Sequence, residues 1–178
     1  MTKRNFSTDY RVPQSRQLLE RFATCEPGET SEPVLDLACR LRRQHAEQWS
    51  AEDLSRNASD NDQVLAEVKR RIDHLNVLRA EIVEELDEYL EKFLPQEADA
   101  LIHTETIGSI IDRICIAWVR ADNFARVSGG EERAALAERQ LRELAGAYDV
   151  LVQEVRAGRR RTPQWRALKS YGEHEGAE

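Results

Sequence analysis

The 178-residue chain contains no run of about 18 apolar residues, and residues 1–10 lack the apolar stretch of a signal peptide. A membrane-spanning helix and a secretory leader are therefore not expected, and the expected location is the cytoplasm. Glycine (8) and proline (5) are also scarce, and each proline falls where a helix would begin, end or break. This scarcity leaves long stretches of the chain free to form helices.

Cysteine occurs only three times, at the widely separated positions Cys25, Cys39 and Cys115. That spacing fits neither a disulfide framework nor a zinc site, so reduced, packed thiols are expected. The chain also lacks a glycine-rich phosphate loop, a GxSxG turn and an HExxH motif, and it has no paired Glu-x-x-His segments for a di-metal bundle. No metal or other cofactor is predicted, and whether the protein is an enzyme stays open.

The balance of hydrophobic (40%) and charged (33%) residues predicts one folded domain over residues 1–178, with flexible ends at 1–12 and 172–178. The net charge of −7 argues against general nucleic-acid binding, although residues 156–169 form a basic segment with no acid. That segment leaves two interpretations open. It could bind phosphate groups, or it could be a solvated cluster that follows a helix C-terminus.

Hydrophobic periodicity predicts an all-α fold, an antiparallel bundle of about five helices with one long heptad-patterned hairpin. From Leu65 to Phe93 the apolar positions alternate steps of three and four, which is typical of a paired helix. Between Ile107 and Val119 apolar residues cover nearly the whole circumference, which predicts a central helix. The expected helices span residues 15–22, 33–56, 62–94, 104–126 and 131–156.

Several polar residues stand where these patterns call for apolar ones. Arg79 occupies a seam position, and His45 lies in the seam of its own predicted helix, one turn before Trp49. A buried polar group costs roughly 1–3 kcal/mol unless it is paired, so each needs a physical reason. The remaining members of the set are Asp73 and Asn76 on a stripe adjacent to Arg79, and Asp112 and Arg113 within an apolar run.

Two interpretations of this set remain open. In the first, the residues converge on an interior pocket for an anionic small molecule. Arg79 or Arg113 would contact the anion, and an acid among Asp73, Asp112 and Glu105 would act as general base. In the second, they form a salt-bridge network, Arg79 with Asp112 or Asp73 with Arg113, that fixes helix register or a dimer interface. His45 could equally be a satisfied core histidine.

A third feature is the segment Glu105–Ser109, where glycine and hydroxyl side chains meet at a predicted helix N-terminus. Free backbone N–H groups there could hold an anion, with Ser109 among the contacts. Ordinary capping of the helix by Thr104 or Thr106 explains the same residues.

Three segments together resemble the bacterial DUF family 4254. They read W-x-x-E-D-x-x-R at 49–56, I-D-x-L-N-x-x-R at 72–79 and E-T-x-G-S-I-I-D-R at 105–113, and the ending QWRALKSYG at 164–172 resembles that of the family as well. The chain departs from the family pattern at Ala80-Glu81 and Ile107. The resemblance implies no mechanism. It does imply an association with glycan or specialised-metabolite biosynthesis.

The segment Lys69–Asp73, with Arg79, also resembles the first helix of the all-helical chorismate mutases. This narrower likeness implies an intertwined helical dimer that binds a dicarboxylate through arginines from several helices.

The sequence therefore predicts a small helical enzyme or ligand-binding protein of a bacterial specialised-metabolite or glycan pathway, with an anionic small molecule as ligand. The alternative is a non-catalytic, dimerising helical scaffold in such a pathway. A homodimer is expected, and neither nucleic acid nor a membrane is an expected partner. The candidate catalytic residues are Asp73, Asp112 and Glu105, and the candidate ligand-binding residues are Asn76, Arg79, Arg113, His45, Trp49 and Ser109.

Overall fold

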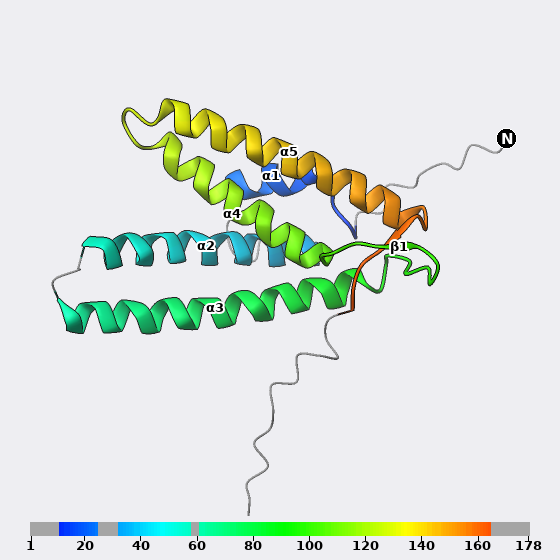
Figure 1. Ribbon diagram of the computed structural model, residues 1–178, viewed down its shortest axis with the longest axis horizontal. Helices are drawn as coiled ribbons and strands as arrows, with labels where there is room; N and C mark the ends of the chain where they lie inside the picture. The colour runs from blue at the N-terminus through cyan, green and yellow to red at the C-terminus, as the bar shows by residue number, and fades with distance from the viewer. Residues whose placement is uncertain (1–10, 25–31, 58–60, 165–178) are drawn as a thin grey trace, which may run out of the picture.

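Five α-helices account for most of the computed structural model, which describes residues 11–24, 32–57 and 61–164 (Figure 1). They are α1 (Ser15–Thr24), α2 (Pro33–Asn57), α3 (Asp62–Leu90), α4 (Ile107–Ala125) and α5 (Glu131–Arg156). The predicted all-α fold is confirmed, and four of the five predicted helices begin within one residue of the observed ones. The fourth helix begins three residues later than predicted.

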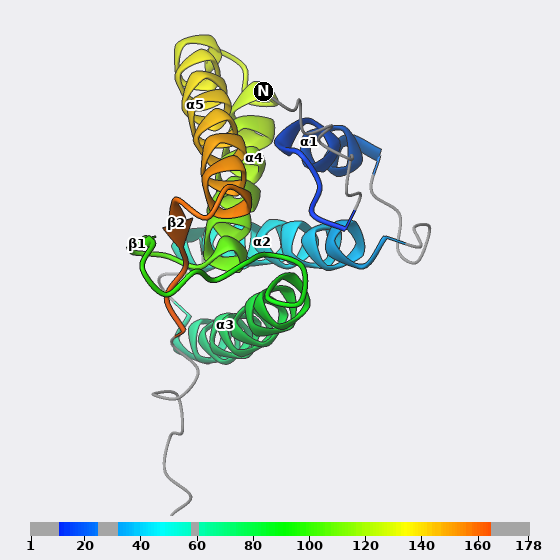
Figure 2. The ribbon, with the colours of Figure 1, turned by 90° about the vertical axis from the view of Figure 1, so that its right-hand side faces the viewer.

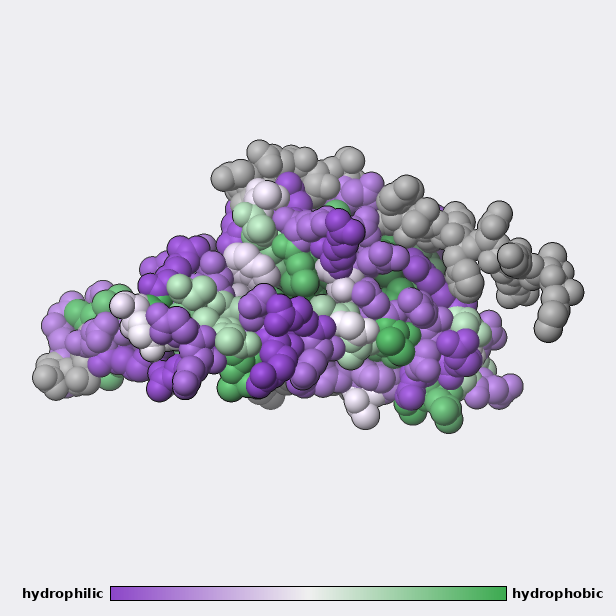
Figure 3. Space-filling view, turned by 90° about the horizontal axis from the view of Figure 1, so that it is seen from above, coloured by the Kyte–Doolittle hydropathy of each residue, from purple (hydrophilic) through white to green (hydrophobic). Residues whose placement is uncertain are grey.

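Helices α2 and α3 lie side by side and antiparallel, and they form the long hairpin that the heptad pattern predicts (Figure 1). The α3 seam is buried at Val68, Leu75, Ile82 and Leu86. At the free end of the hairpin burial decreases, and Leu65 is 37% exposed. Seen from above, this end is a narrow extension with a mainly hydrophilic surface (Figure 3).

Helices α4 and α5 form a second hairpin, and the two hairpins diverge toward their loops (Figures 1 and 2). The turn between α4 and α5 contains Gly129, whose φ of 77° is a conformation that favours glycine. Helix α4 lies between the other layers, and its Ile111, Ile114 and Cys115 are fully buried, as the apolar run predicts. Helix α1 packs against α2 and α5.

Two short strands that the sequence did not predict join distant parts of the chain. β1 (Leu101–Ile102) pairs in parallel with β2 (Arg160–Arg161). Part of the basic segment is therefore structural, and the Arg160 guanidinium also pairs with Glu154 at 2.5 Å. The aromatic and basic residues after 164 lie outside the described residues.

The cysteines differ in state. Cys115 is a free, buried thiol whose Sγ donates to the carbonyl oxygen of Ala38 at 3.6 Å, and burial raises its pKa well above the usual range. Cys39 is in a disulfide, so the expectation of reduced thiols is wrong for this residue. Cys25 lies outside the described residues.

Only the last two residues of the predicted flexible segment 1–12 are described. Val12 is buried, and the Arg11 guanidinium lies 4.4 Å from the centre of the Phe93 ring. The predicted flexible segment 172–178 lies outside the described ranges. Within those ranges no helix combines the length and apolar character that a membrane crossing requires.

Candidate functional site

A buried carboxylate joins the three helices α2, α3 and α4. Asp112 Oδ1 lies 2.7 Å from His45 Nε2 and accepts a hydrogen bond from Arg79 Nε at 2.9 Å, while Oδ2 accepts one from Arg79 Nη2 at 2.5 Å. The side chains of His45 and Asp112 are 7% and 6% exposed, whereas that of Arg79 is 37% exposed. The pairing of Arg79 with Asp112, one of the two predicted, therefore exists, and His45 completes it.

The start of α4 fixes where Asp112 lies. Thr106 Oγ1 accepts a hydrogen bond from the Ser109 backbone N–H at 3.1 Å and caps the helix. The Asp87 carboxylate of α3 accepts one from the Gly108 N–H at 2.7 Å. A Cβ atom on Gly108 would lie 2.6 Å from Asp87 Oδ1, so glycine permits this close approach of α3 and α4. Asp112 follows one turn later, on the face directed toward α2 and α3.

The cluster carries separated charges. Burial alone would raise the pKa of Asp112, but hydrogen bonds from His45 and Arg79 outweigh it and hold the pKa below its usual range. The same hydrogen bond from Arg79 to Asp112 raises the pKa of the guanidinium, although burial acts in the opposite direction. Asp112 is therefore an ionised acceptor and Arg79 a fixed cation at neutral pH.

This charge state predicts acid sensitivity. Because the folded-state pKa of Asp112 is depressed, its contribution to stability is present above the unfolded value of about 4. The contribution is lost as the pH falls from about 4 through the folded pKa, since the unfolded chain then binds a proton that the folded protein does not. We expect the difference in free energy of unfolding between wild type and Asp112→Asn to be largest above about pH 4 and to shrink below it. Urea unfolding from pH 6 to pH 2 measures this difference, and a constant difference would contradict the depressed pKa.

A small cavity opens beside the cluster. We call it the polar cavity; its volume is about 240 Å³. Arg120 makes no ion pair with any described residue, and Glu52 accepts only a long hydrogen bond, 3.4 Å, from Gln48 Nε2. Trp49 meets the Phe124 ring edge to face, with the ring centres 5.9 Å apart. The cavity is lined by His45, Gln48, Trp49, Glu52, Arg79, Ile116, Val119 and Arg120.

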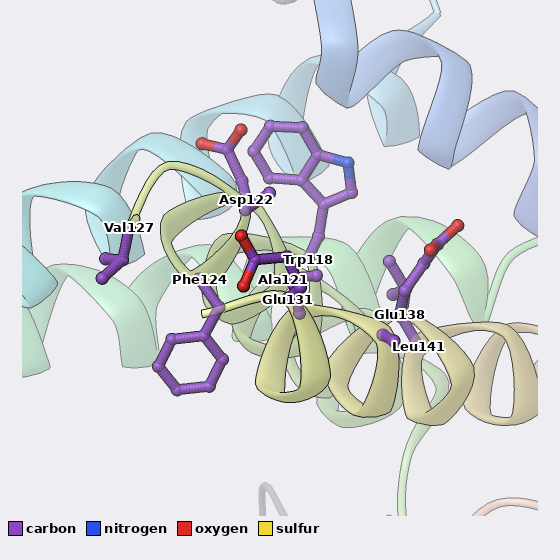
Figure 4. Close-up of a pocket in the computed structure, with 11 residues that line it drawn as sticks. Trp118, Ala121, Asp122, Phe124, Val127, Glu131, Glu138 and Leu141 are labelled. Atoms are coloured by element: carbon purple, nitrogen blue, oxygen red, sulfur yellow. The ribbon is translucent and has the colours of Figure 1, made fainter. Parts of the chain in front are cut away.

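A larger cavity lies elsewhere, between α4 and α5, with a volume of about 600 Å³ (Figure 4). Its floor is largely apolar, and two of its acids are paired: Asp122 with Arg126 at 2.8 Å, and Glu138 with Arg142 at 2.6 Å. It holds no buried titratable cluster like that of Asp112. The polar cavity is therefore the better candidate site despite its smaller size.

Other predicted site residues do not join this cluster. Arg113 is exposed and binds Glu105 through two hydrogen bonds, one of them 2.9 Å from Nε to Oε2. This pair lines a separate cavity of about 190 Å³. The predicted pairing of Arg113 with Asp73 is therefore absent, and Ser109 takes part in the capping of α4, where its Oγ accepts from Thr106 Oγ1 at 2.9 Å.

Asp73 and Asn76 are exposed on α3, and the hydrogen bonds of Asp112 run to His45 and Arg79 instead. Asn76 Oδ1 accepts a 3.3 Å hydrogen bond from Gln48 Nε2, so it adjoins the residues of the polar cavity without lining it. Of the nine candidate residues, the structure brings Arg79, Asp112 and His45 into contact and places Trp49 in the same cavity wall.

Besides two apolar residues, sequence reasoning missed three polar residues that line the polar cavity: Gln48, Glu52 and Arg120. Helical spacing could have found them. Gln48 and Glu52 follow His45 at three and seven positions, and Arg120 follows Asp112 at eight, so each shares a helix face with a residue already selected.

Among the described residues, no group of three or more histidine, cysteine, aspartate or glutamate side chains is arranged to hold a metal ion. The polar side chains that line the polar cavity are two arginines, one glutamate, one glutamine and one histidine.

Comparisons with known proteins give one match. A family model described as "Protein of unknown function (DUF4254)" matches residues 35–163, which include every residue of the polar cavity and its cluster. No curated protein and no solved structure matches the chain.

Proposed function

Since the chain belongs to the DUF4254 family, whose description assigns no activity, we propose a function from the chemistry of the polar cavity: it binds a small anionic molecule. The observation that carries this proposal is the placement of two arginines in one wall. Arg79 uses Nε and Nη2 to bind Asp112, and its Nη1 makes no hydrogen bond with a described residue. Arg120, exposed and unpaired among the described residues, lines the same cavity.

A guanidinium held by a carboxylate is a pre-organised anion contact, because its remaining N–H groups point in a fixed direction. The charge of Asp112 offsets that of Arg79, so Arg120 is the cation left to attract an anion, in a cavity that also contains the Glu52 carboxylate. Arg79 then contributes directed hydrogen bonds, and Arg120 contributes charge.

Glu52 and Trp49, which also line the polar cavity, suggest which groups the ligand carries besides its anionic group. Glu52 can accept hydrogen bonds from hydroxyl or amino groups, and the Trp49 ring provides an apolar surface. A cavity of about 240 Å³ admits a metabolite of modest size. A hydroxylated or amino-bearing carboxylate or phosphate ester fits these groups, and such molecules occur in glycan and specialised-metabolite biosynthesis. On this proposal the protein is a cytoplasmic, bacterial enzyme or ligand-binding protein of such a pathway.

The test uses inorganic phosphate, sulfate and a panel of small carboxylates and phosphate esters in thermal-shift and calorimetric titrations. We expect at least one of them to raise the melting temperature, and Arg120→Gln to weaken its binding about tenfold, because one charge-assisted contact is lost.

Arg139→Gln is the matched control. Arg139 is also an exposed helical arginine without a partner among the described residues, and it lies on α5, outside the polar cavity. Equal weakening in both variants would reflect net charge alone and would contradict a site at Arg120. The absence of binding by every member of the panel would contradict the proposal as a whole.

One observation favours the scaffold alternative. The free end of the α2–α3 hairpin projects away from α4 and α5 and exposes Leu54 and Leu65 (Figure 1). A second copy could cover these side chains, and the Asp112 network would then set helix register. Under this alternative the protein is a concentration-dependent dimer in sedimentation velocity, and no anion protects it against unfolding.

A further inference from the structure

The tautomer of His45 follows from its contact with Asp112. An ionised carboxylate has no proton to donate and can only accept hydrogen bonds. The 2.7 Å contact between Asp112 Oδ1 and His45 Nε2 therefore requires a proton on Nε2. In a neutral imidazole the lone pair must then reside on Nδ1.

Nδ1 is the unused atom of this cluster. It makes no hydrogen bond with any residue that the structure describes, and His45 itself lines the polar cavity. Asp112 and Arg79 are poor proton acceptors by comparison. Asp112 already accepts three hydrogen bonds, and Arg79 is a permanent cation. Among the three, His45 alone has a ring nitrogen whose lone pair is available to accept a proton.

We propose that His45 is the general base of the polar cavity: Asp112 orients its ring through Nε2, and Nδ1 accepts a proton from the molecule bound beside Arg79 and Arg120. The inference rests on the proposed function, since it requires a bound anion that carries an acidic O–H or N–H group. The proton moves from that group to Nδ1, and the resulting imidazolium is stabilised by the Asp112 carboxylate 2.7 Å from Nε2.

This inference changes the roles expected from the sequence. Asp112 was a candidate base, but both of its oxygens are occupied and the pKa of its carboxyl is depressed, so it is a weak proton acceptor. It acts as a positioning residue. His45, expected to bind ligand or only to fill the core, takes the catalytic position.

The first test needs no ligand. Nitrogen NMR of ¹⁵N-histidine-labelled wild-type protein near pH 7.5 reports which ring nitrogen carries the proton in each of the four histidines, and His45→Gln identifies the signals of His45. We expect His45 with a protonated Nε2 and an unprotonated Nδ1. A proton on Nδ1, alone or together with Nε2, would overturn the inference.

The second test compares two tetrahedral anions, each added to saturation as judged by thermal shift. Phosphate near neutral pH carries a P–OH proton that it can donate to Nδ1, whereas sulfate carries none. We expect phosphate to shift the Nδ1 resonance toward the protonated range and sulfate to leave its protonation state unchanged. Equal responses to the two anions would rule out proton acceptance at Nδ1.

The two tests separate the possible failures. If neither phosphate nor sulfate binds, both the proposed anion site and the proton-accepting role of His45 are contradicted. The tautomer measured in the free protein still shows whether Asp112 orients the His45 ring. If both anions bind but Nδ1 carries the proton, the anion site stands and the general base is wrong.

Discussion

Gly108→Ala is expected to lower the free energy of unfolding by about 3 kcal/mol. A Cβ at this position would lie 2.6 Å from Asp87 Oδ1 and 2.8 Å from the carbonyl oxygen of Val83, and the second atom is backbone that cannot turn away. Overpacking of this kind costs about 1–3 kcal/mol, and loss of the hydrogen bond from Gly108 N–H to the Asp87 carboxylate adds about 1.5 kcal/mol. For a chain of this length the melting temperature should fall by about 6–12 °C.

Gly146→Ala provides the control. Gly146 lies exposed in α5, and a Cβ there would meet nothing within 4 Å. In a helix interior alanine is favoured over glycine, so this variant should gain about 0.5–1 kcal/mol. Guanidinium unfolding of both variants gives the comparison, and a Gly108→Ala variant as stable as wild type would show that α3 and α4 are not held this close.

A double-mutant cycle with Asp87→Ala divides the cost of Gly108→Ala. Where the clash with the Asp87 carboxylate dominates, its removal should relieve part of the destabilisation, and the two changes will not be additive. Where the Val83 carbonyl dominates, the two costs should add. Because the Asp87–Gly108 contact positions the start of α4, the same variants should also weaken anion binding at the polar cavity.

The helices could be predicted from the sequence because each is specified by local periodicity. The α5 boundaries, Glu131–Arg156, match the prediction, since the pattern is bounded by Gly130 and Gly158. Helix α3 ends at Leu90, whereas the apolar pattern continues to Phe93 and predicted a helix to residue 94. Pro95 disfavours helical geometry before it, and the last residues close into a turn with Phe93 N–H bonded to the carbonyl oxygen of Leu90. The strand pair could not be predicted, because two residues on each side carry no periodicity.

The site was only partly predictable because its geometry depends on the relative orientation of three helices. The sequence shows Arg79, Asp112 and His45 as polar residues at positions where the helical pattern calls for apolar ones, and in the structure these three residues are in contact. Adjacent residues on a helix point about 100° apart, so Asp112 and Arg113 could not both face the same partner. Only the packing of α4 decides that Asp112 faces inward and that Arg113 turns outward to Glu105.

Asp112→Ala is expected to destabilise the protein by about 3 kcal/mol. The change leaves the His45 N–H and the Arg79 guanidinium without their acceptor, and removing one partner of a buried pair costs about 3–5 kcal/mol. The lower end applies because the Arg79 side chain is 37% exposed and can turn toward water. The matched control is Asp53→Ala, which breaks the exposed pair with Arg56 and should cost less than about 1 kcal/mol. Equal costs in urea unfolding would contradict a buried network.

The double variant Arg79→Met/Asp112→Leu then asks why a charged pair stands in an apolar seam. Apolar replacement of both partners of a buried pair is often neutral or stabilising, so this variant should recover the part of the lost stability that comes from the orphaned Arg79 guanidinium, while the His45 N–H stays without its acceptor. If it also loses the protection against unfolding that we expect a bound anion to give to the wild type, stability is not the reason for the pair. The charges would then serve the cavity, where Arg79 contacts the anion and Asp112 orients His45. If the double variant keeps that protection, anion binding depends on Arg120 alone, and the register-setting network becomes the better account of Arg79 and Asp112.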